Sequence, residues 1–235
     1  MKIKDIIVEN TVVRNKLFHG TSKTLEIGKS YPFKLRESPR DTDIKIHNLA
    51  NNMAIEKFGV PIRNLLFSSI NPDQSISYGN VYEIEPVDKS DKVYFNTNVG
   101  DFTLEFNIGS YYIISQIQRT GFKVTSWMFE QNLSEQADMR DFFDKILEGF
   151  NNKEFIEKYY DDSSGVEFEE ALENAMRVIN RNIKMTINEI QNYIDGITAI
   201  SYSEFKNKSL IHRSSNFMEV MIHAKSGFKV VGQYS

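Results

Sequence analysis

The chain has 235 residues, of which 40% are hydrophobic and 26% charged, and it contains no cysteine. This composition is typical of a globular protein, and the lack of cysteine excludes disulfide scaffolds, thiolate metal sites and cysteine nucleophiles. The formal net charge of −4 argues against a broad basic surface for bulk nucleic-acid binding.

No apolar run reaches the roughly 18 residues that a membrane-spanning helix needs, so we expect a soluble, cytoplasmic protein without a membrane partner. The four histidines show no spacing typical of a metal site, and we therefore expect no metal.

Strand and helix patterns alternate along the first half of the chain. The predicted elements are, in order, a strand over 12–19, a helix over 42–58, a strand over 64–69, a short helix opened by Asn71-Pro72-Asp73 and a strand over 80–86. Two further apolar stretches, 92–96 and 110–118, fit either a strand or a helix.

Residues 134–195 have a different pattern, because their apolar residues recur at the three- and four-residue steps of helices. Polar residues at 161–165 divide this block into two helical parts. Strands are predicted again over 197–202, 217–224 and 227–232. Strands at both ends of the chain, with helices between them, predict an α+β fold: one domain over 1–235 with a helical insertion at 134–195.

Three short motifs carry candidate chemistry. In the first, a strand-like run ends in His19, which Gly20 and Thr21 follow. Glycine has no Cβ, so a ligand or another backbone can approach it closely. The alternative interpretation is an ordinary turn at the end of a strand.

The second motif combines Phe67, Ser68 and Ser69 with Tyr78, which lies eleven residues after Phe67 (78 − 67 = 11). An aromatic ring can stack on a bound pyridinium, with cation–π character. The alternative is that Phe67 simply packs in the core and that Tyr78 packs under a helix.

The third motif is Glu219 within the apolar run 217–222. An unpaired charge is costly to bury, so a lone carboxylate in such a strand suggests a function. A carboxylate stabilises positive charge that develops in a transition state. The alternative is an edge-strand charge that blocks aggregation.

In this order the motifs resemble the NAD-binding signature of the ADP-ribosyltransferase superfamily, which includes diphtheria-toxin-like enzymes and poly(ADP-ribose) polymerases. The resemblance implies a split β-sandwich that cleaves the nicotinamide–ribose bond of NAD and transfers ADP-ribose to a protein or nucleic-acid acceptor. It implies Glu219 as the catalytic carboxylate. The implied NAD-binding residues are His19, Gly20, Thr21, Phe67, Ser69 and Tyr78.

A cation is also needed for the NAD pyrophosphate, since arginine binds phosphate through paired hydrogen bonds. Arg36, Arg40 and Arg63 lie near the first two motifs, and Arg40 is the leading candidate because it precedes the predicted helix over 42–58.

Two departures from the family keep alternatives open. Phe217 stands where arginine-specific members carry a second glutamate, and the second motif mixes features of two subclasses. The chain could therefore be an NAD glycohydrolase, or a non-catalytic virion or binding protein on the same fold. A phosphotransferase relative that acts on RNA is a weaker interpretation, because its second histidine and basic groove are not evident.

The N-terminus over 1–9 resembles the leader peptides of internal head proteins of tailed bacteriophages, which end in an apolar-x-Glu cleavage site, here Ile7-Val8-Glu9. The resemblance implies a phage protein packaged in the virion that acts in the host cytoplasm. The alternative is an ordinary first helical turn.

Overall fold

The computed structural model describes residues 14–36, 44–98, 102, 113–130, 142–210 and 218–234. Arg40, Phe217 and the predicted leader over 1–9 lie outside these residues. The described chain contains both helices and a large sheet, which confirms a mixed α+β fold. None of its described helices combines the length and the apolar character needed to cross a bilayer.

The chain divides into two compact units. The first, which we call the sheet unit, consists of Met1–Phe33, Phe67–Thr97 and Thr198–Ser235. The second, the helical unit, consists of Lys34–Leu66 and Asn98–Ile197. The helical unit is thus larger than the helical insertion predicted at 134–195.

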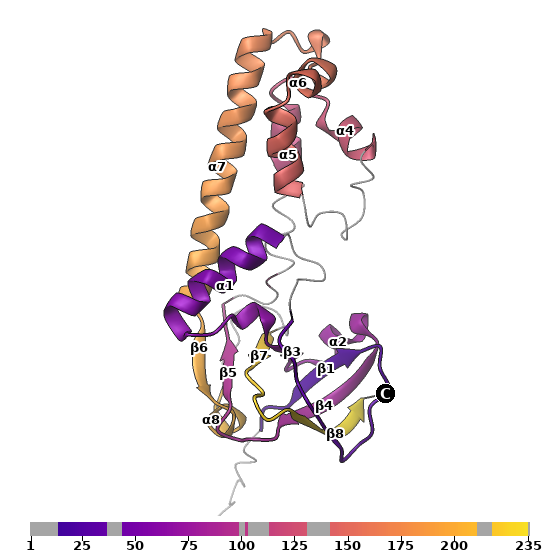
Figure 1. Ribbon diagram of the computed structural model, residues 1–235, viewed down its shortest axis with the longest axis vertical. Coiled ribbons are helices and arrows are strands. Elements are labelled where there is room, and N and C mark those ends of the chain that lie inside the picture. The colour runs from indigo at the N-terminus through magenta and orange to yellow at the C-terminus, as the bar shows by residue number, and fades with distance from the viewer. Residues whose placement is uncertain are drawn as a thin grey trace, which may run out of the picture. The chain divides into compact units, whose positions relative to one another are not determined.

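The eight strands form one sheet in the order β2-β8-β4-β1-β3-β7-β5-β6, and the paired strands run antiparallel (Figure 1). The strands are β1 (Leu17–Thr21), β2 (Ser30–Tyr31), β3 (Leu66–Ser69), β4 (Asn80–Pro86), β5 (Lys92–Phe95), β6 (Thr198–Ser201), β7 (Glu219–Ile222) and β8 (Phe228–Tyr234). Short helices connect them: α2 (Pro72–Ser75), η2 (Ile76–Tyr78) and α8 (Tyr202–Asn207).

The pairing between β1 and β3 is short. These strands share one register pair, Phe18 with Ser69, whereas β1 and β4 share five. We refer to the strands on either side of this junction, β2-β8-β4-β1 and β3-β7-β5-β6, as the two halves of the sheet. In Figure 1, β5 and β6 run steeply while β1 and β4 run obliquely, so the halves differ in direction.

In the core of the sheet unit, β5 is buried on both faces. Val93, Tyr94 and Phe95 of β5 are all at most 4% exposed. The ring of Phe95 meets that of Phe205 on α8 edge-to-face, with centroids 5.3 Å apart. Such continuous burial removes the period-two pattern, because neither face of the strand meets water.

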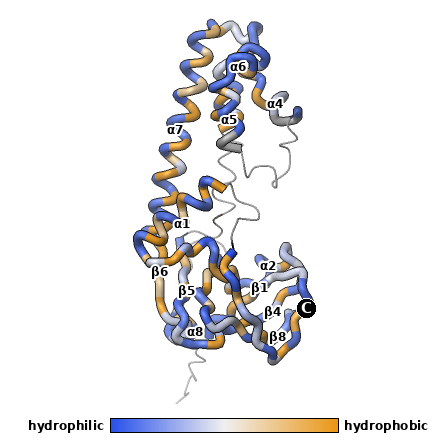
Figure 2. Tube along the Cα trace, in the orientation of Figure 1, coloured by the Kyte–Doolittle hydropathy of each residue, from blue (hydrophilic) through white to orange (hydrophobic). Residues whose placement is uncertain are grey.

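The helical unit contains the remaining elements, together with helical residues at 113–118. They are α1 (Ile44–Phe58), η1 (Ile62–Asn64), α4 (Val124–Glu130), α5 (Phe142–Phe150), α6 (Lys153–Tyr159), η4 (Asp162–Ser164) and α7 (Phe168–Asp195). Hydrophobic and hydrophilic residues alternate along the length of α7 (Figure 2). Ile179 and Ile190 of α7 are buried, whereas Ile187 is 39% exposed, although it continues the apolar repeat of this block at a step of eight residues from Ile179 (187 − 179 = 8).

Local sequence signals placed several elements well. The predicted cap is confirmed, since Asn71 Oδ1 accepts the Asp73 N–H at 2.9 Å and Pro72 begins α2. The strand predicted over 80–86 is β4. The two ambiguous stretches prove to be a strand, β5, and a helix at 113–118.

Candidate functional site

The three motifs lie on three neighbouring strands at the centre of the sheet. His19 and Gly20 belong to β1, Phe67 to Ser69 belong to β3, and Glu219 begins β7. The strand order places β3 directly between β1 and β7. Segments nearly 200 residues apart in sequence (219 − 20 = 199) are therefore gathered by the pairing of these strands.

His19 is held by the backbone of the second motif. Its Nδ1 lies 2.7 Å from the carbonyl oxygen of Phe67. A carbonyl oxygen can only accept, so Nδ1 carries the proton, and in the neutral imidazole Nε2 is then the acceptor. The imidazole also contacts the ring of Phe228, with centroids 5.9 Å apart. The ring is therefore fixed in both orientation and tautomer.

Ser68 ties the second motif to the third. Its hydroxyl donates to the carbonyl oxygen of Val220 at 3.0 Å, and the side chain is only 6% exposed. Val220 directly follows Glu219, which is half-buried at the start of β7. This bond fixes the backbone next to the candidate carboxylate. Sequence reasoning selected Ser69 and missed Ser68, although a serine in a buried strand must find an acceptor.

Ser69 has a local partner set of its own. Its hydroxyl donates to Gln74 Oε1 at 2.5 Å and accepts the N–H of Asn71 at 3.0 Å. It lies opposite Phe18 in the register, and side chains alternate along a strand, so Ser69 shares the face of Phe18 rather than that of His19. Ser69 thus helps to fasten α2 to the sheet.

Gly20 shows why β1 needs a glycine at this place. A Cβ there would lie 2.0 Å from the carbonyl oxygen of Ser75 and 2.8 Å from the Cβ of Tyr78. The Ser75 hydroxyl also donates to the Phe18 carbonyl at 3.0 Å, which holds α2 against β1. The first and second motifs are therefore in direct contact, and the close approach comes from the chain itself.

Tyr78 is half-buried and ends η2 where the chain turns into β4. The turn requires Gly79, whose φ of +113° suits glycine alone. Phe67 is also half-buried and, two residues before Ser69 on β3, shares its face of the strand. Phe67 therefore lies on the face opposite to the His19 side chain, so the register does not gather all of the predicted NAD-binding side chains on one face of the sheet.

Of the candidate arginines, the structure describes Arg36 and Arg63. Arg63 is only 4% exposed and its guanidinium carbon lies 4.1 Å from the centre of the Phe102 ring within the helical unit. An arginine this deeply packed stabilises the fold through stacking, which leaves it poorly suited to a soluble pyrophosphate. Arg36 donates its backbone N–H to the carbonyl of Asn64, also within the helical unit.

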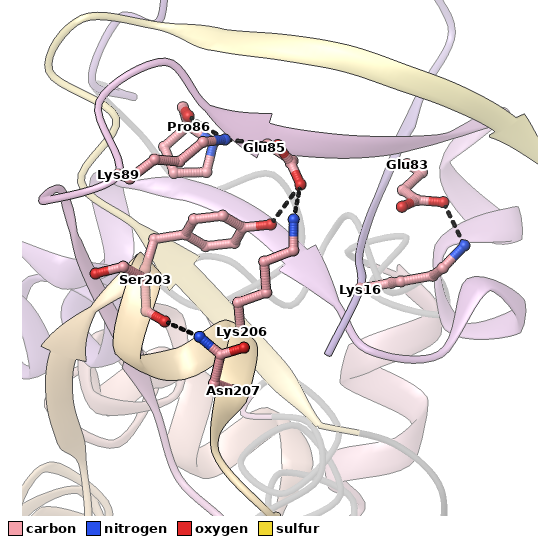
Figure 3. Close-up of polar contacts among 9 residues, drawn as sticks. Lys16, Glu83, Glu85, Pro86, Lys89, Ser203, Lys206 and Asn207 are labelled. Atoms are coloured by element: carbon pink, nitrogen blue, oxygen red, sulfur yellow. Dashed lines mark hydrogen bonds and ion pairs between the residues drawn. The ribbon is translucent and has the colours of Figure 1, made fainter. Parts of the chain in front are cut away.

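A second polar cluster lies on the sheet unit between β4 and α8 (Figure 3). Glu85 Oε2 pairs with Lys89 at 2.6 Å, while Oε1 pairs with Lys206 and accepts the Tyr202 hydroxyl at 3.2 Å. Burial raises the pKa of Glu85, but hydrogen bonds and charges from Lys206 and Lys89 outweigh it and lower the pKa to about 2. Burial and the Glu85 charge raise the pKa of the Tyr202 hydroxyl. This cluster fastens α8 to β4.

Comparisons with protein-family models, with curated proteins and with solved structures find no match to this chain. Among the described residues, no three histidine, aspartate or glutamate side chains gather as a metal site would require. The candidate site therefore consists of the His19 imidazole on β1, Gly20 with Tyr78 close to it, and the half-buried Glu219 carboxylate on β7.

Proposed function

We propose that the chain is an NAD-dependent ADP-ribosyltransferase that cleaves the bond between nicotinamide and ribose and transfers ADP-ribose to an acceptor. The observation that supports this most is the strand order β1-β3-β7, which brings the three motifs onto neighbouring strands. The single-pair junction between the two halves of the sheet agrees with a split β-sandwich.

The roles of the residues follow from their chemistry. His19 Nε2 accepts a ribose hydroxyl, because Nδ1 already donates to Phe67. Tyr78 stacks on the nicotinamide ring beside the backbone of Gly20. Nicotinamide leaves with the electron pair of the glycosidic bond, and the Glu219 carboxylate stabilises the positive charge that develops on the anomeric carbon. The acceptor then bonds to this carbon and loses its proton.

Replacement of Glu219 by glutamine tests this role. Glu219→Gln keeps the size and much of the hydrogen bonding of the side chain but removes its charge. We expect NAD binding, measured by calorimetry, to change little, and nicotinamide release to fall on the order of 10²-fold or more.

Glu83→Gln is the matched control, because Glu83 lies on β4 of the same sheet unit and pairs with Lys16 at 2.8 Å. It should release nicotinamide at the rate of the unmodified protein. Equal rates for Glu219→Gln and the unmodified protein would reject Glu219 as the catalytic carboxylate.

The second candidate is a non-catalytic binding or virion protein on the same fold, and one observation favours it. Gly20 and Ser69 are both explained by the packing of α2, through the Ser75 carbonyl and the Gln74 side chain. Neither residue therefore needs NAD to account for it. Calorimetry with NAD followed by an assay for free nicotinamide separates binding without turnover from catalysis.

A further inference from the structure

The segment that follows the first motif is anchored by two tyrosine hydroxyls. Tyr82 accepts the N–H of Leu25 at 3.1 Å, and Tyr31 accepts the N–H of Glu26 at 2.7 Å. The next turn is bonded to β8, since the Gly28 N–H donates to the Val230 carbonyl at 2.8 Å. Residues 22–29, which we call the anchored segment, thus have a fixed position beside β1.

Both anchoring tyrosines are connected to His19. Tyr82 lies opposite His19 in the β1–β4 register, so the two side chains share one face of the sheet. The Tyr31 ring stacks on Phe228 with centroids 5.9 Å apart, and Phe228 in turn contacts the His19 imidazole. The anchored segment is therefore linked to His19 through the β1–β4 register and through the ring of Phe228.

The anchored segment holds two lysines, and they differ in their surroundings. Lys29 pairs with Glu26 at 2.5 Å, so its charge is compensated locally. Lys23 is exposed, and within the described part of the chain no carboxylate pairs with its ammonium group. Its backbone N–H donates to Thr21 Oγ1 at 3.2 Å, which fixes its Cα directly after the first motif.

We propose that Lys23, presented by the anchored segment, binds the diphosphate of the dinucleotide. This inference rests on the proposed function. The diphosphate joins the two ribose units of NAD, so its cation must lie near the residue that binds ribose, here His19. Lys23 is four residues beyond His19, whereas Arg63 is buried in the helical unit. An ammonium group contributes to phosphate binding as a point charge.

Calorimetry with NAD, ADP and adenosine tests the assignment on the full chain. Lys23→Gln should weaken the binding of NAD and of ADP about 10-fold and reduce its dependence on salt, as loss of one charged contact does. Adenosine, which has no phosphate, should bind equally well to both proteins. Lys16→Gln is the control. Lys16 directly precedes β1, whereas Lys23 follows it, and Lys16 pairs with Glu83.

The anchoring is tested by the double variant Tyr31→Phe and Tyr82→Phe, which keeps both rings and removes only the two acceptors. Amide hydrogen exchange at Leu25 and Glu26 should become faster, and the affinity for ADP should fall toward that of Lys23→Gln. Unchanged exchange, or faster exchange with unchanged ADP affinity, would overturn the role of the anchors.

The outcomes separate this inference from the proposed function. If the unmodified protein binds NAD and Lys23→Gln binds it and ADP with the same affinity, the diphosphate assignment is wrong while the proposed function stands. If the unmodified protein binds neither NAD nor ADP, the proposed function fails and the assignment fails with it.

Discussion

The Glu85 cluster makes a prediction about stability that the structure allows us to quantify. Glu85 on β4 is joined to α8 by Lys206 and Tyr202, and its side chain is 19% exposed. Glu85→Gln keeps the shape of the side chain but removes the charge that both lysines face. Because the partners of the charge remain, we expect the variant to fold but to be less stable at neutral pH.

The size of the effect follows from the pKa. A fall in the pKa of Glu85 from 4.5 to about 2 corresponds, before any screening by solvent, to about 3 kcal/mol of folding free energy, at about 1.36 kcal/mol for each pKa unit. Lys89 is 49% exposed, so solvent screens part of this interaction. We therefore expect Glu85→Gln to lower the free energy of unfolding by about 1–2 kcal/mol at pH 7.

The lowered pKa of Glu85 also predicts how the stability difference between the two proteins changes with pH. A carboxylate whose pKa is lowered by folding stabilises the fold above its unfolded pKa, and this contribution disappears as the pH falls through the folded value. The difference between the two proteins should be constant above about pH 5 and should vanish as the pH falls toward about 2. Urea unfolding at several pH values between these limits measures it.

Glu83→Gln is again the matched control. Glu83 lies two residues earlier on β4, and its partner Lys16 is 60% exposed. It should change the free energy of unfolding by less than about 1 kcal/mol, as exposed ion pairs do. An effect of Glu85→Gln no larger than that of Glu83→Gln, or one that persists at the lowest pH, would refute the account of this cluster.

Two further predictions concern the site. Gly20→Ala places a Cβ 2.0 Å from the Ser75 carbonyl oxygen and should lower the free energy of unfolding in urea by about 3 kcal/mol. The control Gly232→Ala, whose Cβ would meet its nearest atoms at 3.7 Å, should lower it by less than about 1 kcal/mol. Equal costs would show that α2 moves away easily. The chain should transfer ADP-ribose poorly to arginine analogues, since Phe217 replaces the second glutamate, and Phe217→Glu should increase that transfer; efficient labelling of agmatine by the unmodified protein would contradict this.

The sequence predicted elements that depend on local chemistry. Asn71 and Pro72 announce the start of α2, and the strand over 80–86 ends at Pro86, which cannot continue a ladder in the usual way. These signals act over a few residues and do not depend on the tertiary structure around them. The exposed Ile187 shows the limit, because an apolar period on a helix indicates a face but cannot say whether anything covers the whole of it.

The parts of the site that the sequence could not place depend on strand register. Ser68 and Ser69 are adjacent and chemically identical, yet one bonds to β7 and the other to α2. A shift of one residue in the register would exchange their faces. Arg63 is a similar case, since its partner Phe102 is 39 residues away in sequence (102 − 63 = 39). No local pattern records such a contact.

Gly20 and His19, the first two residues of the first motif, differ in whether packing alone explains them. Gly20 must be a glycine because the Ser75 carbonyl occupies the space where its Cβ would be, and this reason holds with or without a ligand. His19 differs in its chemistry, because its Nδ1 donates to the Phe67 carbonyl and Nε2 is then the acceptor of the neutral imidazole. Ser69 is likewise explained by α2, whereas Glu219 is a half-buried carboxylate at the start of an otherwise buried strand, where it can stabilise a positive charge. The case for NAD chemistry therefore depends on His19 and Glu219 rather than on the small residues that make the signature recognisable, and it is at these two side chains that substitution will decide between an enzyme and a binding protein.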